Sequence, residues 1–360
     1  MLFDTFSLGS ISLANRLVMS PMTRSRAVEH NTPNALMATY YAQRASAGLI
    51  IAEGTSPSPN GLGYARIPGL FNREHVKGWK LVTEAVHSEG GKIVVQLMHT
   101  GWVTHLANLP VGARVLGPVT GQCPGTLWTD TQGMQAHSLA QAMTEADIAA
   151  TVKEYAQAAA LAMEAGFDGV EVHAANGYLI EQFLNANVNT RTDDYGGSIE
   201  GRNRFTLEVL AATTQAIGSQ HVGLRLSPYG VFNSTGPFPE VEAQLLALTQ
   251  ALSELRLMYL HVLDHSAMGA PPVPEALKQQ MRKTFKGPFI AAGGFDRDSA
   301  EATLQAGSAD LIGIGRAFLA NPDLVTRWKA GAALNTPDMS TFYTADAKGY
   351  TDYPRMAIAE

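Results

Sequence analysis

Eight short apolar segments, separated by longer helical patterns, recur along the whole chain and constrain its fold more than any other feature. Most of them are continuous apolar runs, as expected for parallel strands that are covered on both faces. They comprise residues 16–20, 49–53, 92–97, 169–172, 222–226, 257–263, 288–292 and 311–314. Eight such strands alternating with helices predict a closed (β/α)8 barrel of the α/β class, with a doubly wound open sheet as the alternative.

Several of the helices between these strands have recognisable starts. Thr144, with Asp147 three residues on, predicts the N-cap of a helix that runs to Gly166. Asp296 precedes a helix that is expected to end at residue 307. Asn321, followed by proline, indicates a third N-cap with proline at the first helical position.

The stretch of residues 101–143, after the third expected strand, is far longer than an ordinary connection from strand to helix. It carries prolines, glycines and scattered apolar residues, so we expect it to form a hairpin that caps the C-terminal mouth of the barrel. No internal repeat or linker divides the sequence, and we therefore expect a single domain over residues 1–360.

Composition excludes several classes of function. A formal net charge of −6 and the absence of a run of Lys and Arg argue against a nucleic-acid partner. No apolar stretch has the length of a membrane span, and the N-terminus does not resemble a secretory signal, so we expect a cytoplasmic protein without a membrane partner. The one cysteine, Cys123, excludes an intrachain disulfide and a thiolate metal cluster, and we expect no metal.

Polar residues gather where the expected strands end. In a barrel of this class the carboxyl ends of the strands build the active site. The first strand ends in Pro21-Met22-Thr23-Arg24, the third in Gln96-Leu97-Met98-His99 and the fourth in His173-Ala174-Ala175-Asn176-Gly177-Tyr178, and the fifth holds Arg225.

The ends of the last two strands indicate a phosphate site. Gly293 and Gly294 follow the seventh strand, and Gly315 and Arg316 follow the eighth. Glycine lets backbone N–H groups approach an anion closely, and the arginine can add a charge-assisted hydrogen bond. The alternative interpretation is an ordinary turn beside a surface cation.

His173 and Asn176 place two hydrogen-bond donors three residues apart, directly after a strand. Two such donors can hold one carbonyl or nitro oxygen, and they stabilise it more as it gains negative charge. Tyr178 adds a phenol that is protonated at neutral pH and can give a proton to a carbanion. Taken alone, the motif is also typical of a core histidine and a helix-capping asparagine.

These residues lie in segments that resemble the Old Yellow Enzyme family of FMN-dependent ene-reductases over nearly the whole chain. The longest segment is residues 166–205, GFDGVEVHAANGYLIEQFLNANVNTRTDDYGGSIEGRNRF, and others are QLMHTGWVTH, GLRLSPYG and GIGRAFLANPDL. Within the family, the sequence resembles the bacterial nitroester, nitroaromatic and cyclohexenone reductases of the classical branch. Thr23, in place of a cysteine, separates it from the thermophilic-like branch.

The opening segment LFDTFSLGSISLANRLVMSPMTRSRA resembles the N-terminal hairpin and first strand of the family, which implies a hairpin before the barrel. The resemblance also implies a tightly bound, non-covalent FMN and assigns residues to it. The positions that match FMN contacts are Pro21, Met22, Thr23, Gly54, Gln96 and Arg225 at the ring, and Gly293, Gly294, Gly315 and Arg316 at the phosphate. The positions that match substrate contacts are Tyr64, Met98, His173, Asn176 and Tyr343, with Tyr178 as the proton donor. Many relatives have a second histidine at position 176 and a bulky aromatic at position 98, so no specific substrate is transferred.

The reaction that the resemblance implies is a ping-pong hydride transfer. NADPH or NADH reduces FMN, hydride passes from N5 to the β-carbon of an α,β-unsaturated carbonyl or nitroalkene, and Tyr178 protonates the α-carbon. Reduction of nitrate esters or nitroaromatics at the same site stays open, as do a phosphate-binding barrel isomerase or aldolase and a non-enzymatic flavin-binding module. The expected partners are activated alkenes, nitro compounds and phenolic inhibitors, and the chain is expected to be a monomer or a homodimer.

Overall fold

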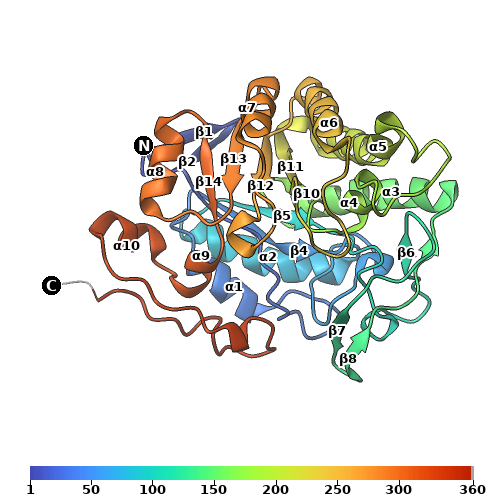
Figure 1. The fold of residues 1–360 in the computed structure, drawn as a ribbon. Helices are drawn as coiled ribbons and strands as arrows, with labels where there is room; N and C mark the ends of the chain where they lie inside the picture. Colours follow the sequence, from blue (N-terminus) through green and yellow to red (C-terminus); the bar gives the residue numbers. More distant parts are fainter. Residues whose placement is uncertain (358–360) are drawn as a thin grey trace.

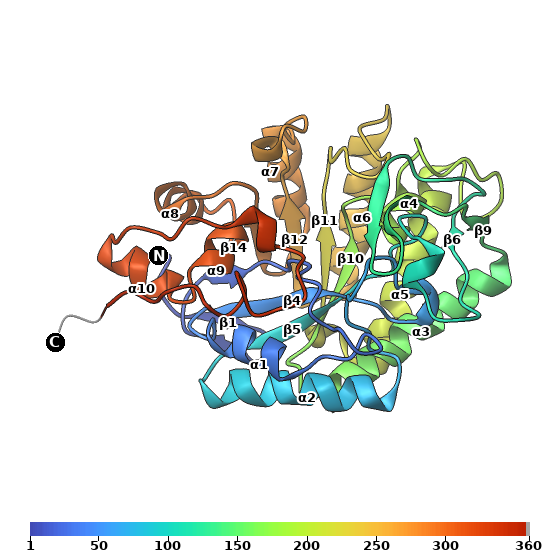
Figure 2. The same cartoon turned by 90° about the horizontal axis from the view of Figure 1, so that it is seen from below.

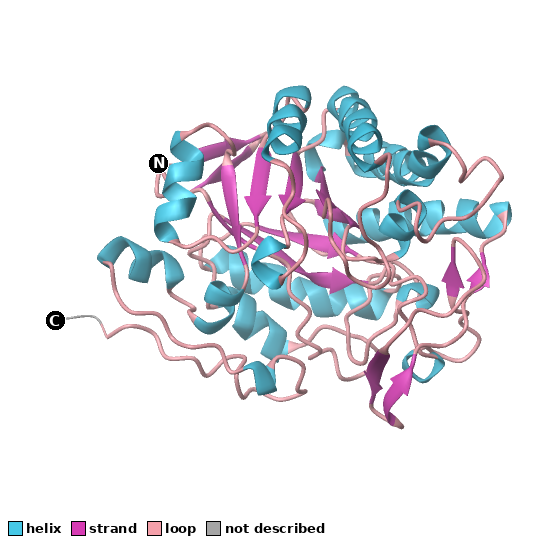
Figure 3. Ribbon diagram, viewed as in Figure 1, coloured by secondary structure: helices cyan, strands magenta, loops and turns pink. Residues whose placement is uncertain are grey.

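The computed structural model describes residues 1–357 and closes eight parallel strands into one barrel (Figures 1 and 3). Each strand lies within two residues of its expected bounds at either end, and β14 pairs with β3 to close the sheet. The (β/α)8 barrel is therefore confirmed, and the open sheet is wrong. The strands are β3 (Leu17–Met19), β4 (Leu49–Thr55), β5 (Ile93–Leu97), β10 (Val170–Ala174), β11 (Val222–Leu226), β12 (Tyr259–Leu263), β13 (Phe289–Ala292) and β14 (Leu311–Ile314).

Helices surround the barrel, and α1 and α2 lie side by side outside β4 and β5 (Figure 2). Within residues 1–357, no helix is both long and apolar enough to cross a membrane. The helices are α1 (Ala35–Ala42), α2 (Arg73–Ser88), α3 (Glu145–Glu164), α4 (Leu179–Leu184), α5 (Ile199–Ile217), α6 (Val241–Leu255), α7 (Glu275–Thr284), α8 (Arg297–Gln305), α9 (Arg316–Ala320) and α10 (Leu324–Ala330).

Two of the three predicted helix starts are confirmed. Thr144 and Asp147 form a reciprocal capping box at α3, and Asp296 caps α8 in the same way. The prediction for Asn321 is wrong, because α10 begins at Leu324. The side chain of Asn321 instead donates to the carbonyl oxygen of Ala317 at 2.9 Å and accepts from the backbone of Asn335 at 2.8 Å.

The predicted N-terminal hairpin closes one end of the barrel. It consists of β1 (Phe6–Leu8) and β2 (Ile11–Leu13), which pair antiparallel. Leu8 and Leu13 are fully buried and pack against the first residues of the barrel strands, among them Leu49 and Leu311. An apolar plug thus fills the end opposite the polar strand ends.

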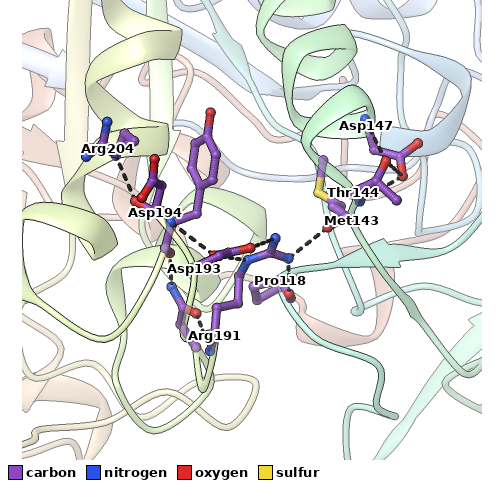
Figure 4. A network of polar contacts seen from close by, with 10 residues as sticks. Pro118, Met143, Thr144, Asp147, Arg191, Asp193, Asp194 and Arg204 are labelled. Carbon is purple, nitrogen blue, oxygen red and sulfur yellow. Dashed lines mark hydrogen bonds and ion pairs between the residues drawn. The ribbon is translucent and has the colours of Figure 1, made fainter.

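The long insertion after β5 contains the expected hairpin, which projects from the barrel body in Figure 1. Its strands β7 (Thr126–Thr129) and β8 (Gly133–Ala136) pair antiparallel, while β6 (Leu116–Gly117) and β9 (Gln141–Ala142) form a short parallel pair. Arg191, in the loop between α4 and α5, connects this loop to the insertion by hydrogen bonds (Figure 4). Its guanidinium donates to the carbonyl oxygens of Pro118 and Met143 at 2.7 and 2.8 Å.

The C-terminal segment crosses the barrel face and is fastened there by two fully buried arginines, Arg24 and Arg26. Arg24 donates to the carbonyl oxygen of Gly349 at 2.8 Å, and Arg26 donates to that of Phe342 at 2.8 Å. Both arginines follow the predicted flavin-contact residues after β3. This fastening places Tyr343, the neighbour of Phe342, at the mouth of the barrel.

Candidate active site

A cavity of about 890 Å³ opens at the carboxyl ends of the barrel strands. A cavity of this size is typical of a site for a cofactor or a drug-sized ligand. It brings together ten residues that sequence reasoning assigned to the site: Pro21, Thr23, Tyr64, Gln96, Met98, His173, Asn176, Tyr178, Arg225 and Tyr343.

The other assigned residues do not line this cavity. Gly54 lies directly under Met98, because a methyl group at Gly54 would be 2.6 Å from the Met98 sulfur. Met22 lies next to Gly315, with its sulfur 3.6 Å from the position of a β-carbon there. The remaining members are Gly293, Gly294 and Arg316, at the ends of β13 and β14.

His173 and Asn176 lie side by side in the cavity wall, with Nε2 of the imidazole 3.5 Å from Nδ2 of the amide. The Nδ1 atom of His173 and the Oδ1 atom of Asn176 are buried without a hydrogen-bond partner among the described residues. Asn176 is not a helix cap, since the N-cap of α4 is Tyr178. Buried polar atoms without partners are rare in folded proteins and indicate a place where a ligand binds.

The imidazole of His173 is neutral at neutral pH. Burial, together with the nearby Arg225, His261 and His265, lowers the pKa of His173 well below its ordinary value. A neutral imidazole can donate one hydrogen bond to an oxygen without carrying a charge into the cavity. The pair therefore suits a neutral ligand oxygen that gains negative charge during a reaction.

Tyr178 lies beside this pair and donates a hydrogen bond to the hydroxyl of Tyr64 at 3.1 Å. Its ring meets that of His173 edge to face, with the ring centroids 5.2 Å apart. Burial raises the pKa of Tyr178 to about 12, although the hydrogen bond with Tyr64 opposes this rise. The phenol is therefore protonated at neutral pH and can act as a proton donor.

A buried polar cluster lies inside the barrel next to the cavity. Glu171 accepts hydrogen bonds from Gln96 Nε2 at 2.7 Å and lies 2.8 Å from Nδ1 of His261. Burial raises the pKa of Glu171, but His261, Arg225 and Gln96 outweigh burial and hold it below its ordinary value. Glu171 is therefore a carboxylate. Because it engages the amide nitrogen of Gln96, the amide oxygen is left for a donor of another molecule.

Arg225 completes this cluster with a guanidinium that lines the cavity. Its Nε atom is buried and has no hydrogen-bond partner among the described residues. A cation with an unused donor, beside an amide oxygen, fits the polar edge of an isoalloxazine ring. This chemistry agrees with the flavin contacts assigned to Gln96 and Arg225.

The strand ends next to the cavity also fit a phosphate group. Ala292 pairs with Gly313 across β13 and β14, so the glycines after these two strands lie on neighbouring strand ends. Gly293 and Gly294 have φ angles of 133° and 72°, and a β-carbon at Gly293 would be 2.2 Å from the carbonyl oxygen of Asp264. The backbone N–H groups of Gly294 and Arg316 donate to no other described residue. Free N–H groups at glycine turns are typical of phosphate sites.

Sequence reasoning missed the residues at the rim of the cavity. Arg66 donates to the backbone oxygen of Tyr343 at 2.7 Å and to that of Ser25 at 3.0 Å, and it forms an ion pair with Asp130 in the turn of the β7–β8 hairpin. The hairpin also contributes Trp128 to the lining. These residues belong to no motif, and the one available signal was a tryptophan in a hairpin expected to cap the barrel.

Cys123 and Asp264 both have a structural role or a structural partner outside the cavity. The thiol of Cys123 is buried, and burial raises its pKa to about 11, which leaves it unreactive. Asp264 pairs with Lys278 at 3.1 Å. Neither residue lines the cavity.

Comparison with known proteins identifies a family over nearly the whole chain. Residues 1–335 match the model of the NADH:flavin oxidoreductase / NADH oxidase family. The chain is 42% identical over 354 residues to a probable flavin mononucleotide-dependent alkene reductase of Leishmania infantum, and the match covers 97% of this chain and 95% of the relative. It is 37% identical over 375 residues to 12-oxophytodienoate reductase 7 of Oryza sativa subsp. japonica, with 98% and 94% covered.

Solved structures agree over the same length. Morphinone reductase superposes with a TM-score of 0.95 at 43% identity, covering 99% of this chain and 96% of that one. The old yellow enzyme homologue from Zymomonas mobilis superposes with a TM-score of 0.93 at 37% identity, covering 98% and 99%. With a cavity that fits a flavin ring and a neighbouring cradle that fits its phosphate, the chain belongs to the NADH:flavin oxidoreductase / NADH oxidase family as an Old Yellow Enzyme homologue, a flavin-dependent oxidoreductase whose cofactor is FMN and whose reductant is a nicotinamide.

Proposed function

We propose that the protein reduces the carbon–carbon double bond of α,β-unsaturated carbonyl compounds and nitroalkenes, with NADPH or NADH as the source of electrons. One observation carries the proposal: His173, Asn176 and Tyr178 line one wall of the cavity, as two donors beside a protonated phenol. A site that only bound flavin would require neither group.

His173 and Asn176 would hold the activating oxygen of the substrate. Each side chain offers an N–H donor, from the amide Nδ2 of Asn176 and from one ring nitrogen of the neutral His173, and a carbonyl or nitro oxygen can accept from both. Their hydrogen bonds strengthen as charge moves onto the oxygen, so they favour the transition state over the bound substrate. The β-carbon becomes electrophilic as a result.

Tyr178 would deliver a proton to the α-carbon. Its hydroxyl carries a proton throughout the neutral range, and the hydrogen bond to Tyr64 fixes its orientation. Thr23, Gln96 and Arg225 would hold the ring of FMN, and bound FMN supplies the hydride chemistry that amino-acid side chains lack. Gly293, Gly294, Gly315 and Arg316 would bind its phosphate.

The names of relatives support this assignment. One curated relative is described as a probable alkene reductase, and three structural neighbours are structures of morphinone reductase, two of them in complex with tetrahydroNAD. Because the same oxygen pair can hold a nitro group, reduction of nitrate esters and nitroaromatics is a second candidate function of this cavity.

A labelling experiment tests the proposal. The holoenzyme is incubated with 2-cyclohexenone and with NADPH that carries deuterium at the nicotinamide C4 position. We expect cyclohexanone with deuterium at the β-carbon, detected by NMR. Absence of the saturated ketone, while nitrate esters or nitroaromatics are consumed, would favour the second candidate. Turnover of none of these compounds would reject the proposal.

A further inference from the structure

The turn that carries Asn176 has a backbone conformation that its surroundings must maintain. Asn176 and Gly177 both have left-handed backbone angles, with φ of 60° and 73°. A residue with a side chain adopts this region at a cost in free energy, and such residues persist only where neighbours hold them. A methyl group at Gly177 would lie 2.4 Å from the carbonyl oxygen of Phe232, so this position is closed to larger residues.

Both N–H groups of this turn are connected to one carboxyl group, one of them directly and the other through a serine hydroxyl. The N–H of Gly177 donates to Oε2 of Glu181 at 2.6 Å, and the N–H of Asn176 donates to the hydroxyl of Ser227 at 2.9 Å. The Ser227 hydroxyl in turn donates to Glu181, with 3.2 Å to Oε2 and 3.3 Å to Oε1. Glu181 therefore holds the turn directly at one residue and through Ser227 at the other.

The carbonyl groups of the turn are bonded independently. The carbonyl oxygen of Asn176 accepts from Asn233 Nδ2 at 2.8 Å, and that of Gly177 accepts from Gln182 Nε2 at 2.8 Å. All four backbone polar groups of the turn are thus satisfied by side chains. Only Glu181 among these side chains is ionisable, so only this contact can change with pH.

Glu181 is a buried carboxyl group without a cation beside it. It is 8% exposed and forms no ion pair with any residue in the described part of the chain. It also borders a second cavity of about 30 Å³, behind the ends of β10 and β11, which is large enough for a water molecule. Burial raises the pKa of Glu181 to about 8, against the opposing effect of the Gly177 N–H and the Ser227 hydroxyl. No charged side chain contributes to this pKa.

We propose that Glu181, acting directly and through Ser227, is a positioning residue that sets the place of Asn176 and hence the strength with which the site holds a ligand oxygen. The inference rests on the function proposed above, in which Asn176 contacts that oxygen. The ionised carboxylate accepts charge-assisted hydrogen bonds from both Gly177 and Ser227. The protonated form has one acceptor fewer, and its own proton competes for the Ser227 hydroxyl. Ligand affinity should therefore rise as pH increases through the pKa of Glu181.

The test uses the oxidised holoenzyme and p-methoxyphenol, a phenol that stays un-ionised between about pH 6 and pH 9. Its dissociation constant is measured by flavin absorbance across this range for the wild type, Glu181→Gln and Ser227→Ala. Glu254→Gln is the matched control, because it removes the same charge at an exposed position on α6. Flavin content and the affinity for FMN are measured alongside.

We expect wild-type affinity to rise about threefold or more over this range, and that of Glu254→Gln to do the same. Glu181→Gln should bind about tenfold more weakly at the alkaline end and show no pH dependence, with FMN affinity unchanged. Ser227→Ala should weaken binding and retain a smaller rise with pH, which keeps the test valid if Glu181→Gln does not fold.

Two results would overturn the inference. One is binding by both variants within about twofold of the wild type at every pH. The other is weakened binding by Glu181→Gln with an unchanged pH profile. If the wild type binds no phenol and reduces no enone, the proposed function fails instead, so the two failures are distinguishable.

Discussion

Tyr178 and Tyr64 meet across the cavity, with a 3.1 Å hydrogen bond between their hydroxyl groups and their rings edge to face at 6.1 Å. Tyr178 follows β10, whereas Tyr64 lies in the loop after β4, so the contact joins distant parts of the barrel rim. Burial raises the pKa values of both phenols above their ordinary value. In this hydrogen bond the proton of Tyr178 is directed at Tyr64, so the Tyr178 hydroxyl would turn away from Tyr64 when it gives its proton to a substrate.

Removing the hydroxyl of Tyr178 should separate the two halves of the reaction. We expect Tyr178→Phe to slow reoxidation of the reduced enzyme by 2-cyclohexenone about 100-fold or more, the range that a general acid contributes. Reduction by NADPH should change little, because it needs no proton from this residue. Anaerobic stopped-flow absorbance measures both steps. Tyr64→Phe is the control and should lose less than about tenfold in reoxidation. An equal loss in both steps for Tyr178→Phe would contradict its role as donor.

Removing the oxygen-binding pair should weaken ligand binding. The double variant His173→Ala with Asn176→Ala loses two hydrogen bonds worth about 1 kcal/mol or more each, so phenol affinity should fall about 30-fold or more. Spectral titration of the oxidised holoenzyme measures the dissociation constant. FMN content should stay unchanged, since neither residue is assigned to the cofactor. Unchanged phenol affinity in a flavin-replete variant would remove the pair from the site.

The pH dependence of the chemical step follows from two pKa shifts. The lowered pKa of His173 keeps its imidazole neutral above mildly acidic pH, and the raised pKa of Tyr178, at about 12, keeps its phenol protonated well above neutrality. At saturating enone, the reoxidation rate should therefore show no loss of a proton donor between about pH 7 and pH 10. A decline with its midpoint inside that range, present in the wild type and absent in Tyr178→Phe, would show that the phenol ionises earlier.

Arg66 should control the stability of the hairpin over the cavity. It joins Asp130 of the hairpin turn to the backbone of Tyr343 in the C-terminal segment. We expect Arg66→Ala to accelerate proteolysis within residues 126–136 several-fold, while global stability falls by about 1 kcal/mol or less because Asp130 is 46% exposed. Limited proteolysis followed by mass spectrometry locates the cleavage. Arg73→Ala, which breaks an exposed ion pair between α2 and α3, is the control. Equal cleavage rates in both variants would show that Arg66 does not hold the hairpin.

The barrel could be predicted from the sequence because its signals are local. The strand Val222–Leu226 has the same bounds as its continuous apolar run, and the start of α3 follows from Thr144 and Asp147 alone. The start of α10 could not be predicted, because Asn335, distant in sequence, engages the side chain of Asn321 and prevents it from capping the helix.

The residues along one cavity wall were also predictable, since parallel strands bring their carboxyl ends to one rim. The contacts that support them were not. Arg66 and Tyr343 are 277 residues apart, and Glu181 reaches Ser227 from 46 residues away. No residue pattern predicts such contacts, because they depend on how loops from different strands fold over the rim. The left-handed backbone conformation of Asn176 could not be predicted from the sequence for the same reason.

The proposed flavin chemistry is tested most directly by the absorbance spectrum of the purified protein, recorded anaerobically before and after addition of NADPH and then of 2-cyclohexenone. We expect a flavin spectrum that bleaches with the reductant and returns with the enone. A colourless protein that also fails to bind added FMN would contradict this expectation.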